Sequence, residues 1–201
     1  MKTLIPRLKR PTSKILFLFL AGYSANTLGV EQLEYELLSS FDDIEIRSYD
    51  SYRLASVNVS SDFNSAGNTA FRELFKFISG ENREAQKIAM TAPVLQKQSQ
   101  NGWSVSFVMP KSESDLETPE PLSSRVTRET IDSTLIAAIE YSGSWRQSRF
   151  ITHREKLFKA LEDSTYSACG EVIWARYNSP FSIPFMRRNE VMVEICVKAI
   201  D

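Results

Sequence analysis

Residues 54–59 read LASVNV, and 82 positions later residues 136–141 read IAAIEY. In both stretches apolar side chains recur at alternate positions, which is the spacing of a half-buried β-strand. The same displacement carries the Arg-Glu pair at 72–73 onto the Arg-Glu pair at 154–155. The sequence therefore predicts two related units in one chain.

The first unit is predicted to run strand, helix, strand, strand. Strand patterns cover 33–61, and a broad apolar stripe predicts a helix over about 64–78 that ends at Gly80. Two further strands are expected at 86–97 and 103–109.

The second unit follows the same order. After the repeated strand we expect a helix at about 147–163 and strands at 171–177 and 190–197, with a Pro/Ser/Glu-rich linker at 110–124 before the unit. Neither unit has enough sheet to cover its own helix. The predicted fold is α+β: two strand–helix–strand–strand repeats that form one distorted antiparallel barrel or sheet with two main helices. A cleft where such halves meet is a common ligand site.

Residues 87–94, KIAMTAPV, place a proline among strand-forming residues. Proline cannot donate to a β-ladder, so Pro93 predicts a sheet edge or a bulge. The second unit repeats the feature, because TAPV at 91–94 is echoed by NSPF at 178–181. A strand that stops pairing there would expose an apolar rim suited to a ligand.

The N-terminus has the layout of a secretory signal, since five basic residues precede the apolar run at 15–21. That run is too short to span a bilayer as a helix. We expect residues 1–29 to be a signal peptide and 30–201 the mature domain, periplasmic or secreted. An uncleaved membrane anchor is the alternative, followed by a basic leader in the cytoplasm.

Loss of residues 1–29 would remove five basic and no acidic residues, changing the net charge from −1 to −6. An acidic body argues against nucleic acid as a partner. The two cysteines are Cys169 and Cys196. A hairpin centred near Pro184 places Cys196 opposite Val172, and Cys169 is then too far along the ladder for a disulfide. This register predicts two separate thiols.

Four stretches stand out along the chain: KIAMTAPV at 87–94, YNSPF at 177–181, PF at 184–185 and RRNEV at 187–191. Together they resemble the SOUL/haem-binding protein family, and the similarity extends over about 34–197. The resemblance implies a distorted antiparallel barrel with two helices, also found in bacterial multidrug- and gyrase-inhibitor-like effector domains. It also implies non-covalent binding of a tetrapyrrole in a shallow apolar groove.

Carried onto this chain, the resemblance places the groove between the first helix and the loop before the last strand. The implied ligand-binding residues are Phe71, Phe75 and Lys76 on the helix, and Phe181, Ile183, Pro184, Phe185, Met186 and Arg187 in the loop. Lys76 is interpreted as a partner for a propionate. Arg187 and Arg188 could clamp two propionates, and the alternative is that they pair with acidic residues of the hairpin. Arg176 is a weaker candidate than either.

No residue is predicted to bind the iron. His153, the only histidine, shares the apolar face of the second helix with Phe150 and Leu157, which favours a packing role. Met90 and Met192 are interpreted as core residues, and Met186 as part of the apolar wall of the groove. No nucleophile–base pattern or metal-binding motif is present, so the chain is not predicted to be an enzyme.

The leading hypothesis is a non-covalent haem or tetrapyrrole binder that buffers or carries haem as an exchangeable ligand. The main alternative is a general effector-binding domain of the gyrase-inhibitor-like type, without preference for haem. Two further hypotheses are an enzyme that uses a carboxylate such as Glu73 or Glu155, and a protein-interaction role for the aromatic loop.

Overall fold

The structure is a computed structural model that describes residues 30–111 and 118–198. The predicted signal peptide lies outside the described residues. The first half contains the strands β1 (Glu31–Gln32), β2 (Glu36–Phe41), β3 (Ile44–Tyr49), β4 (Tyr52–Val59), β5 (Thr91–Ala92), β6 (Val94–Ser99) and β7 (Gly102–Val108), and the helix α1 (Phe63–Ile78).

The second half repeats this order. It contains β8 (Val126–Ile131), β9 (Thr134–Tyr141), α2 (Gln147–Glu162), β10 (Tyr166–Ala168), β11 (Ile173–Arg176), the short 3₁₀ helix η1 (Pro184–Met186) and β12 (Asn189–Val197). The predicted helices are confirmed almost to the residue. The region 33–61 is three strands, and the predicted strand 86–97 starts later because residues 86–90 are not in a strand.

Ten strands form the main sheet, with the path β2-β3-β9-β12-β11-β6-β7-β4-β8 and β10 beside β12. The sheet is open, because β2 and β8 lie at opposite ends of this path. The two halves meet where β11 pairs with β6, and the order outward from this seam is equivalent on both sides. The α+β class and the two repeats are therefore confirmed, with an open sheet in place of a closed barrel.

The halves also exchange one strand each. β3 precedes β4 in the chain but pairs with β9 of the second half. Equivalently, β8 precedes β9 but pairs with β4 of the first half. Each half therefore completes the sheet of the other, so the two units form one folding unit with a shared core.

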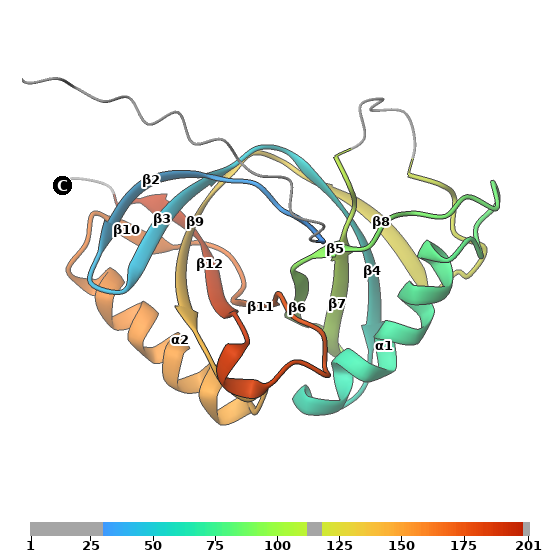
Figure 1. The fold of residues 1–201 in the computed structure, drawn as a ribbon. Helices are drawn as coiled ribbons and strands as arrows, with labels where there is room; N and C mark the ends of the chain where they lie inside the picture. The colour runs from blue at the N-terminus through green and yellow to red at the C-terminus, as the bar shows by residue number, and fades with distance from the viewer. Residues whose placement is uncertain (1–29, 112–117, 199–201) are drawn as a thin grey trace, which may run out of the picture.

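The two helices cover the same face of the sheet, one over each half (Figure 1). α1 packs on β4 and β7, and α2 packs on β9, β10 and β12. Asp62 begins α1 by accepting hydrogen bonds from the backbone N–H groups of Asn64 and Ser65. Gly80, with a φ of 109°, follows the end of that helix, as its sequence position predicts.

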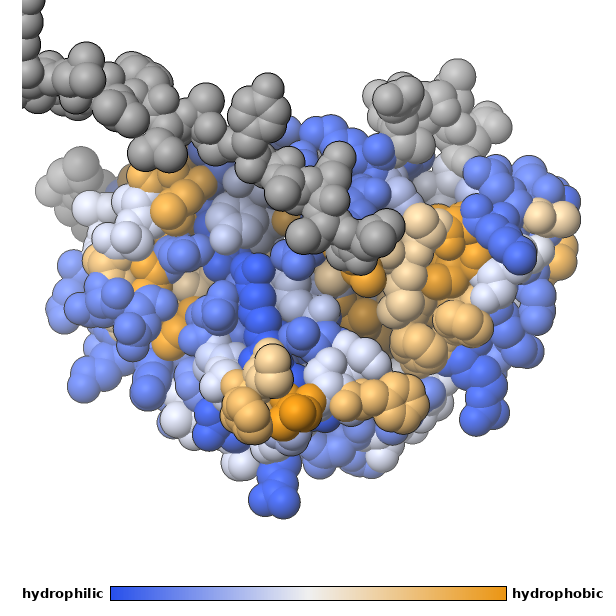
Figure 2. Space-filling model, in the orientation of Figure 1, coloured by the Kyte–Doolittle hydropathy of each residue, from blue (hydrophilic) through white to orange (hydrophobic). Residues whose placement is uncertain are grey.

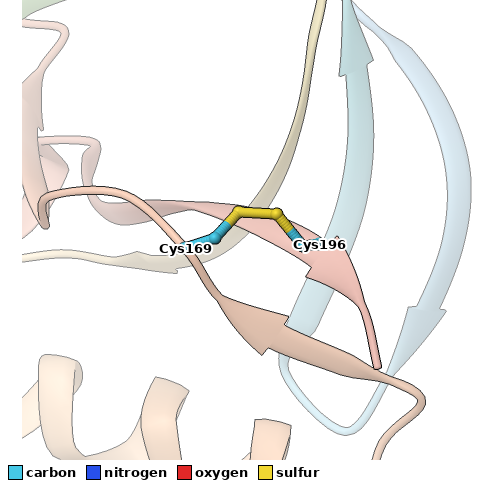
Figure 3. Close-up of a disulfide and its surroundings, with 2 residues drawn as sticks. All are labelled: Cys169 and Cys196. Carbon is cyan, nitrogen blue, oxygen red and sulfur yellow. A yellow bond between two sulfur atoms is a disulfide. The ribbon is translucent and has the colours of Figure 1, made fainter. Parts of the chain in front are cut away.

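The prediction of two separate thiols is wrong. Cys169 and Cys196 form a disulfide, with their Cα atoms 5.9 Å apart (Figure 3). The error lies in the register, because Ile173 is opposite Met192 and not three residues further along. Beyond β11, the strand β10 pairs with the same end of β12 in a shifted register, with Ser167 opposite Cys196, and the backbone N–H of Cys169 donates to the carbonyl of Glu194. Cys169 is therefore close enough to Cys196 to bond with it. The disulfide ties the segment between β10 and β11 to the last strand.

Pro93 marks neither an edge nor a bulge but the junction between β5 and β6. β5 pairs in parallel with β1, whereas β6 lies between β11 and β7 in the centre of the main sheet. The missing N–H of Pro93 therefore falls where the chain changes from one sheet to the other. Within residues 30–111 and 118–198, no helix combines the length and apolar character needed to cross a membrane.

Candidate functional site

The segment between β11 and β12 carries a cluster of exposed apolar side chains. Phe181 is 96% exposed, Phe185 73%, Met186 66% and Ile183 53%. The segment lies between the N-terminal ends of the two helices (Figure 1), and Figure 2 shows a raised apolar patch at this place. Side chains of this size are normally buried, so such a patch indicates a binding surface. We call residues 178–188 the apolar loop.

Hydrogen bonds hold the apolar loop in shape. Arg187 donates from Nε to the carbonyl of Ser182 at 2.9 Å and from Nη2 to the carbonyl of Pro180 at 2.7 Å. The side chain of Asn178 accepts a hydrogen bond from the backbone N–H of Arg188 at 2.7 Å. The loop therefore presents its apolar residues without folding them inward. Arg187, predicted to bind a propionate, also has a structural role in the loop.

On α1 the structure brings Phe71 and Phe75 together. Their rings stack with centroids 5.7 Å apart, and Phe71 also packs edge-on against Phe107 of β7. Phe75 is 48% exposed and thus offers a flat apolar face to the solvent. Lys76 is turned away from this pair and lines a small cavity with Glu73 and Leu122. The predicted helix residues therefore divide between two surfaces.

Larger cavities lie elsewhere. One of about 690 Å³ lies beside β1 and the start of β4, and another of about 770 Å³ lies between β2 and the C-terminal part of α2. Neither is lined by the apolar loop or by Phe71 and Phe75. The predicted site is thus an open surface and not an enclosed pocket.

Arg188, a weaker candidate for ligand binding, and Tyr177 belong to a buried network on the face of the sheet opposite the helices. Both donate hydrogen bonds to the carboxylate of Glu190. Arg188 also pairs with Glu140. Burial would raise the pKa of Glu190, but hydrogen bonds and charges from Arg47 and Arg188 hold it below its usual value. These residues stabilise the sheet.

Arg176 lies in an environment of aromatic rings. It lies on β11, near the seam of the two halves, and its guanidinium carbon is 4.7 Å from the ring centre of Trp174 and 5.3 Å from that of Trp145. Nη2 donates to the side chain of Gln96 at 3.3 Å, and Nε is buried without a partner. Burial lowers the pKa of Arg176 to about 10.

His153 contacts neither the apolar loop nor the Phe71–Phe75 pair in the interactions that hold its ring. Nδ1 of His153 donates to the carbonyl of Arg149 at 2.7 Å, and the ring stacks on Tyr141 with centroids 4.0 Å apart. Burial lowers the pKa of His153, so the neutral ring is favoured. Met192 is buried in the sheet, whereas Met90 is 39% exposed. Within the described ranges, His, Cys, Asp and Glu do not gather in any group able to hold a metal ion.

The family model described as SOUL heme-binding protein matches residues 30–194. The chain belongs to this family. It is 26% identical over 190 residues to Heme-binding protein 1 of Xenopus tropicalis, covering 85% of this chain and 96% of that protein. It is 30% identical over 162 residues to Heme-binding protein 2 of Homo sapiens, covering 73% and 75%.

Solved structures share the fold at low sequence identity. The C-terminal domain of EcmrR superimposes with a TM-score of 0.58 at 10% identity, over 82% of this chain and 99% of that domain. A hydrolase from Listeria innocua gives a TM-score of 0.52 at 12% identity, over 77% of this chain and 92% of that one. At these identities the likeness concerns the fold alone.

The family's name raises the question of whether these residues suit haem. A porphyrin presents two flat apolar faces and acidic side chains at one edge. Phe75 and the apolar loop supply exposed apolar surface, and Arg176 supplies a cation without a carboxylate partner in the described part of the chain. The residues therefore fit the macrocycle, and they offer no assembled set of protein ligands for its iron.

Proposed function

We propose that this protein binds haem or a related tetrapyrrole non-covalently and buffers or carries it, without catalysing a reaction. Family membership supports the ligand class. The single observation that carries the proposal is the apolar loop, whose four large apolar side chains are more than half exposed on a hydrogen-bonded frame.

Burial of the macrocycle is the main source of affinity in this proposal. Covering about 300 Å² of apolar ligand surface contributes roughly 7 kcal/mol, at about 25 cal/mol per Å², before the costs of association. Because a Kd of 1 μM corresponds to about 8 kcal/mol, this burial sets the micromolar range as the upper limit of the affinity. Such a ligand exchanges readily, as carriage or buffering requires, and differs from a permanent prosthetic group.

We also propose that the protein acts outside the cytoplasm, in the periplasm or after secretion. The basic and apolar N-terminal pattern supports export. The Cys169–Cys196 disulfide supports it independently, because disulfides persist mainly in oxidising compartments. Fractionation of cells, with mass measurement of the exported chain, tests both export and removal of the first 29 residues. A full-length chain confined to the cytoplasm would contradict the proposal.

Titration of the purified chain with haem, followed through the Soret band, tests the binding function. We expect a saturable shift of the band at micromolar haem. An unchanged spectrum over that range would eliminate tetrapyrrole binding as the function. The second candidate, a general effector-binding domain, is favoured by the lack of an assembled iron-ligand set among the described residues. Competition between haem, metal-free porphyrin and unrelated planar dyes separates the two, because only the second candidate predicts equal binding of the dyes.

A further inference from the structure

Arg176 is a largely buried cation with no ion-pair partner in residues 30–111 and 118–198. Its contacts are two indole rings and one neutral amide. Taking a charged group out of water without a counter-charge is costly. Its Nε–H is one of four buried polar atoms in the described residues that lack a hydrogen-bond partner. This part of the fold therefore has an excess of positive charge.

The position of the guanidinium is fixed by the chain around it. A Cβ atom on Gly67 of α1 would lie 2.5 Å from Nη1 and 2.6 Å from Nη2 of Arg176, so only glycine leaves room for the group. On its other side, Gln96 receives one hydrogen bond from Arg176 and donates another to the carbonyl of Phe63. Helix, strand and tryptophans together form a preformed seat for this cation.

Further positive potential converges on the same place. The guanidinium of Arg187 lies 4.4 Å from the ring centre of Trp145, the ring that Arg176 also contacts. Trp145 directly precedes α2, whose first turn contains no acidic residue and whose N-cap, Arg146, makes no capping hydrogen bond through its side chain. The N-terminal end of a helix carries partial positive charge. Two arginines and the N-terminal end of α2 thus surround Trp145, and the backbone N–H of Gln147 at that end donates to the side chain of Asn64 at 3.3 Å.

The apolar surface of α1 starts one turn from this seat. Phe71 follows Gly67 by four residues and Phe75 by eight, so the three lie along one side of the helix. At 1.5 Å per residue, the two phenylalanines are about 6 and 12 Å from Gly67 along the helix axis. A flat ligand resting on these rings would have one edge directed along the helix toward Gly67, beside which the guanidinium lies.

We propose that Arg176 is a carboxylate-binding subsite: its guanidinium pairs with a carboxylate at the edge of a flat apolar ligand whose body lies on Phe71 and Phe75. This inference rests on the proposed function for the identity of the natural ligand. The chemistry of the subsite extends to any planar apolar molecule with such an acid. Arg176 sets selectivity for the acid, and the apolar rings supply most of the affinity.

Two pairs of probes test the subsite on the full chain. Each pair shares an apolar body and differs in its acid: mesoporphyrin IX against its dimethyl ester, and 1-pyrenebutyrate against 1-pyrenebutanol. Binding is followed by the fluorescence of the probe and, separately, by the tryptophan fluorescence of the protein, since Arg176 contacts two of its three tryptophans, Trp145 and Trp174. We expect each acid to bind about tenfold or more tightly than its neutral partner, as a charged hydrogen-bonded pair requires.

Three variants locate the effect. Arg176→Gln should abolish the preference for the acids and leave binding of the neutral probes within about twofold. Gly67→Ala leaves the arginine in the chain but displaces its guanidinium, and should reduce the preference. This variant keeps the test valid if Arg176→Gln folds poorly, because alanine is favoured within a helix. Arg83→Gln, which removes an exposed arginine beyond the end of α1, should behave as wild type.

The outcomes separate the subsite from the haem proposal. A preference for pyrenebutyrate that depends on Arg176, without binding of either porphyrin, supports the subsite and contradicts tetrapyrrole binding. Equal binding of mesoporphyrin and its ester supports tetrapyrrole binding and overturns the subsite. Retention of the preference in Arg176→Gln also overturns it, and absence of binding by all four probes overturns both.

Discussion

Nη1 and Nη2 of Arg47 donate hydrogen bonds to the two carboxylate oxygens of Glu190, at 2.7 and 3.0 Å, across 143 residues of sequence. Arg47 lies on β3 and Glu190 on β12, and β9 lies between these strands. Both side chains are almost completely inaccessible to solvent. The pair therefore fixes the strand that the first half contributes to the second.

Replacement of Glu190 by glutamine should destabilise the fold strongly. The substitution removes the buried counter-charge of Arg47, which keeps only its pair with the partly exposed Glu45. Breaking a buried pair from one side typically costs about 3–5 kcal/mol. Urea unfolding measures the loss. Glu34→Gln is a matched control, because Glu34 pairs with Lys111 on the surface and such pairs contribute about 1 kcal/mol or less. Equal losses in the two variants would contradict a stabilising role for the buried pair.

The same carboxylate makes stability depend on pH in a defined direction. Its pKa in the folded chain is below that of an ordinary glutamate, so the unfolded chain binds protons more readily in acid. The contribution of Glu190 is therefore complete above the ordinary glutamate pKa of about 4.3 and is lost as the pH falls through the lower folded value. Urea midpoints between neutral pH and pH 3 should fall less steeply for Glu190→Gln than for wild type.

The sequence repeat predicts most of the helices and strands, but it does not predict that the two halves exchange a strand. β4 and β9 are displaced by the same 82 residues as the pattern that predicts them, and both helices follow from their apolar stripes. Alternation of side chains identifies a strand and its buried face. It does not identify the neighbouring strand, so the pairing of β3 with β9 required the structure.

The site was predicted unevenly for a physical reason. A run of phenylalanine, isoleucine and proline between two strands has few ways to be buried, and the apolar loop is indeed exposed. Arg176 carries a signal that was present in the sequence. Side chains alternate along a strand, so Arg176 lies on the same face of β11 as the buried Trp174. A charged side chain on a buried face is unusual and indicates a specific role. The gap at Gly67 that accommodates it appears only in three dimensions.

Loss of the Cys169–Cys196 disulfide should lower stability by about 3–4 kcal/mol, the chain-entropy value for a loop of this length. The two residues are 27 positions apart in the sequence. Unfolding is compared for wild type with and without reductant and for the double variant Cys169→Ser/Cys196→Ser, which should not respond to reductant. Alkylation of unfolded, unreduced wild type should modify no cysteine. Two modified thiols would show that the disulfide does not form.

Replacement of His153 by alanine should leave the Soret band of the haem complex in place. The ring is occupied in packing on Tyr141 and in a hydrogen bond to Arg149. Loss of the stacked pair should lower stability by about 0.5–1.5 kcal/mol. The absorption spectrum and thermal unfolding of the variant are compared with wild type. A displaced Soret band at unchanged occupancy would identify His153 as an iron ligand and contradict its packing role.

Truncation of the apolar loop should weaken ligand binding while leaving the fold intact. Phe181 and Phe185 contribute little to the core because both are mostly exposed, so Phe181→Ala and Phe185→Ala should change stability by about 0.5 kcal/mol or less. Each ring removed deprives a bound macrocycle of apolar contact, which should reduce haem affinity about tenfold. Leu122→Ala is the control, since this side chain is 66% exposed but lies beyond α1 beside Glu73 and Lys76. Equal affinity in all three variants would show that the ligand binds away from the loop, because only two of them alter the surface that the proposal places against it.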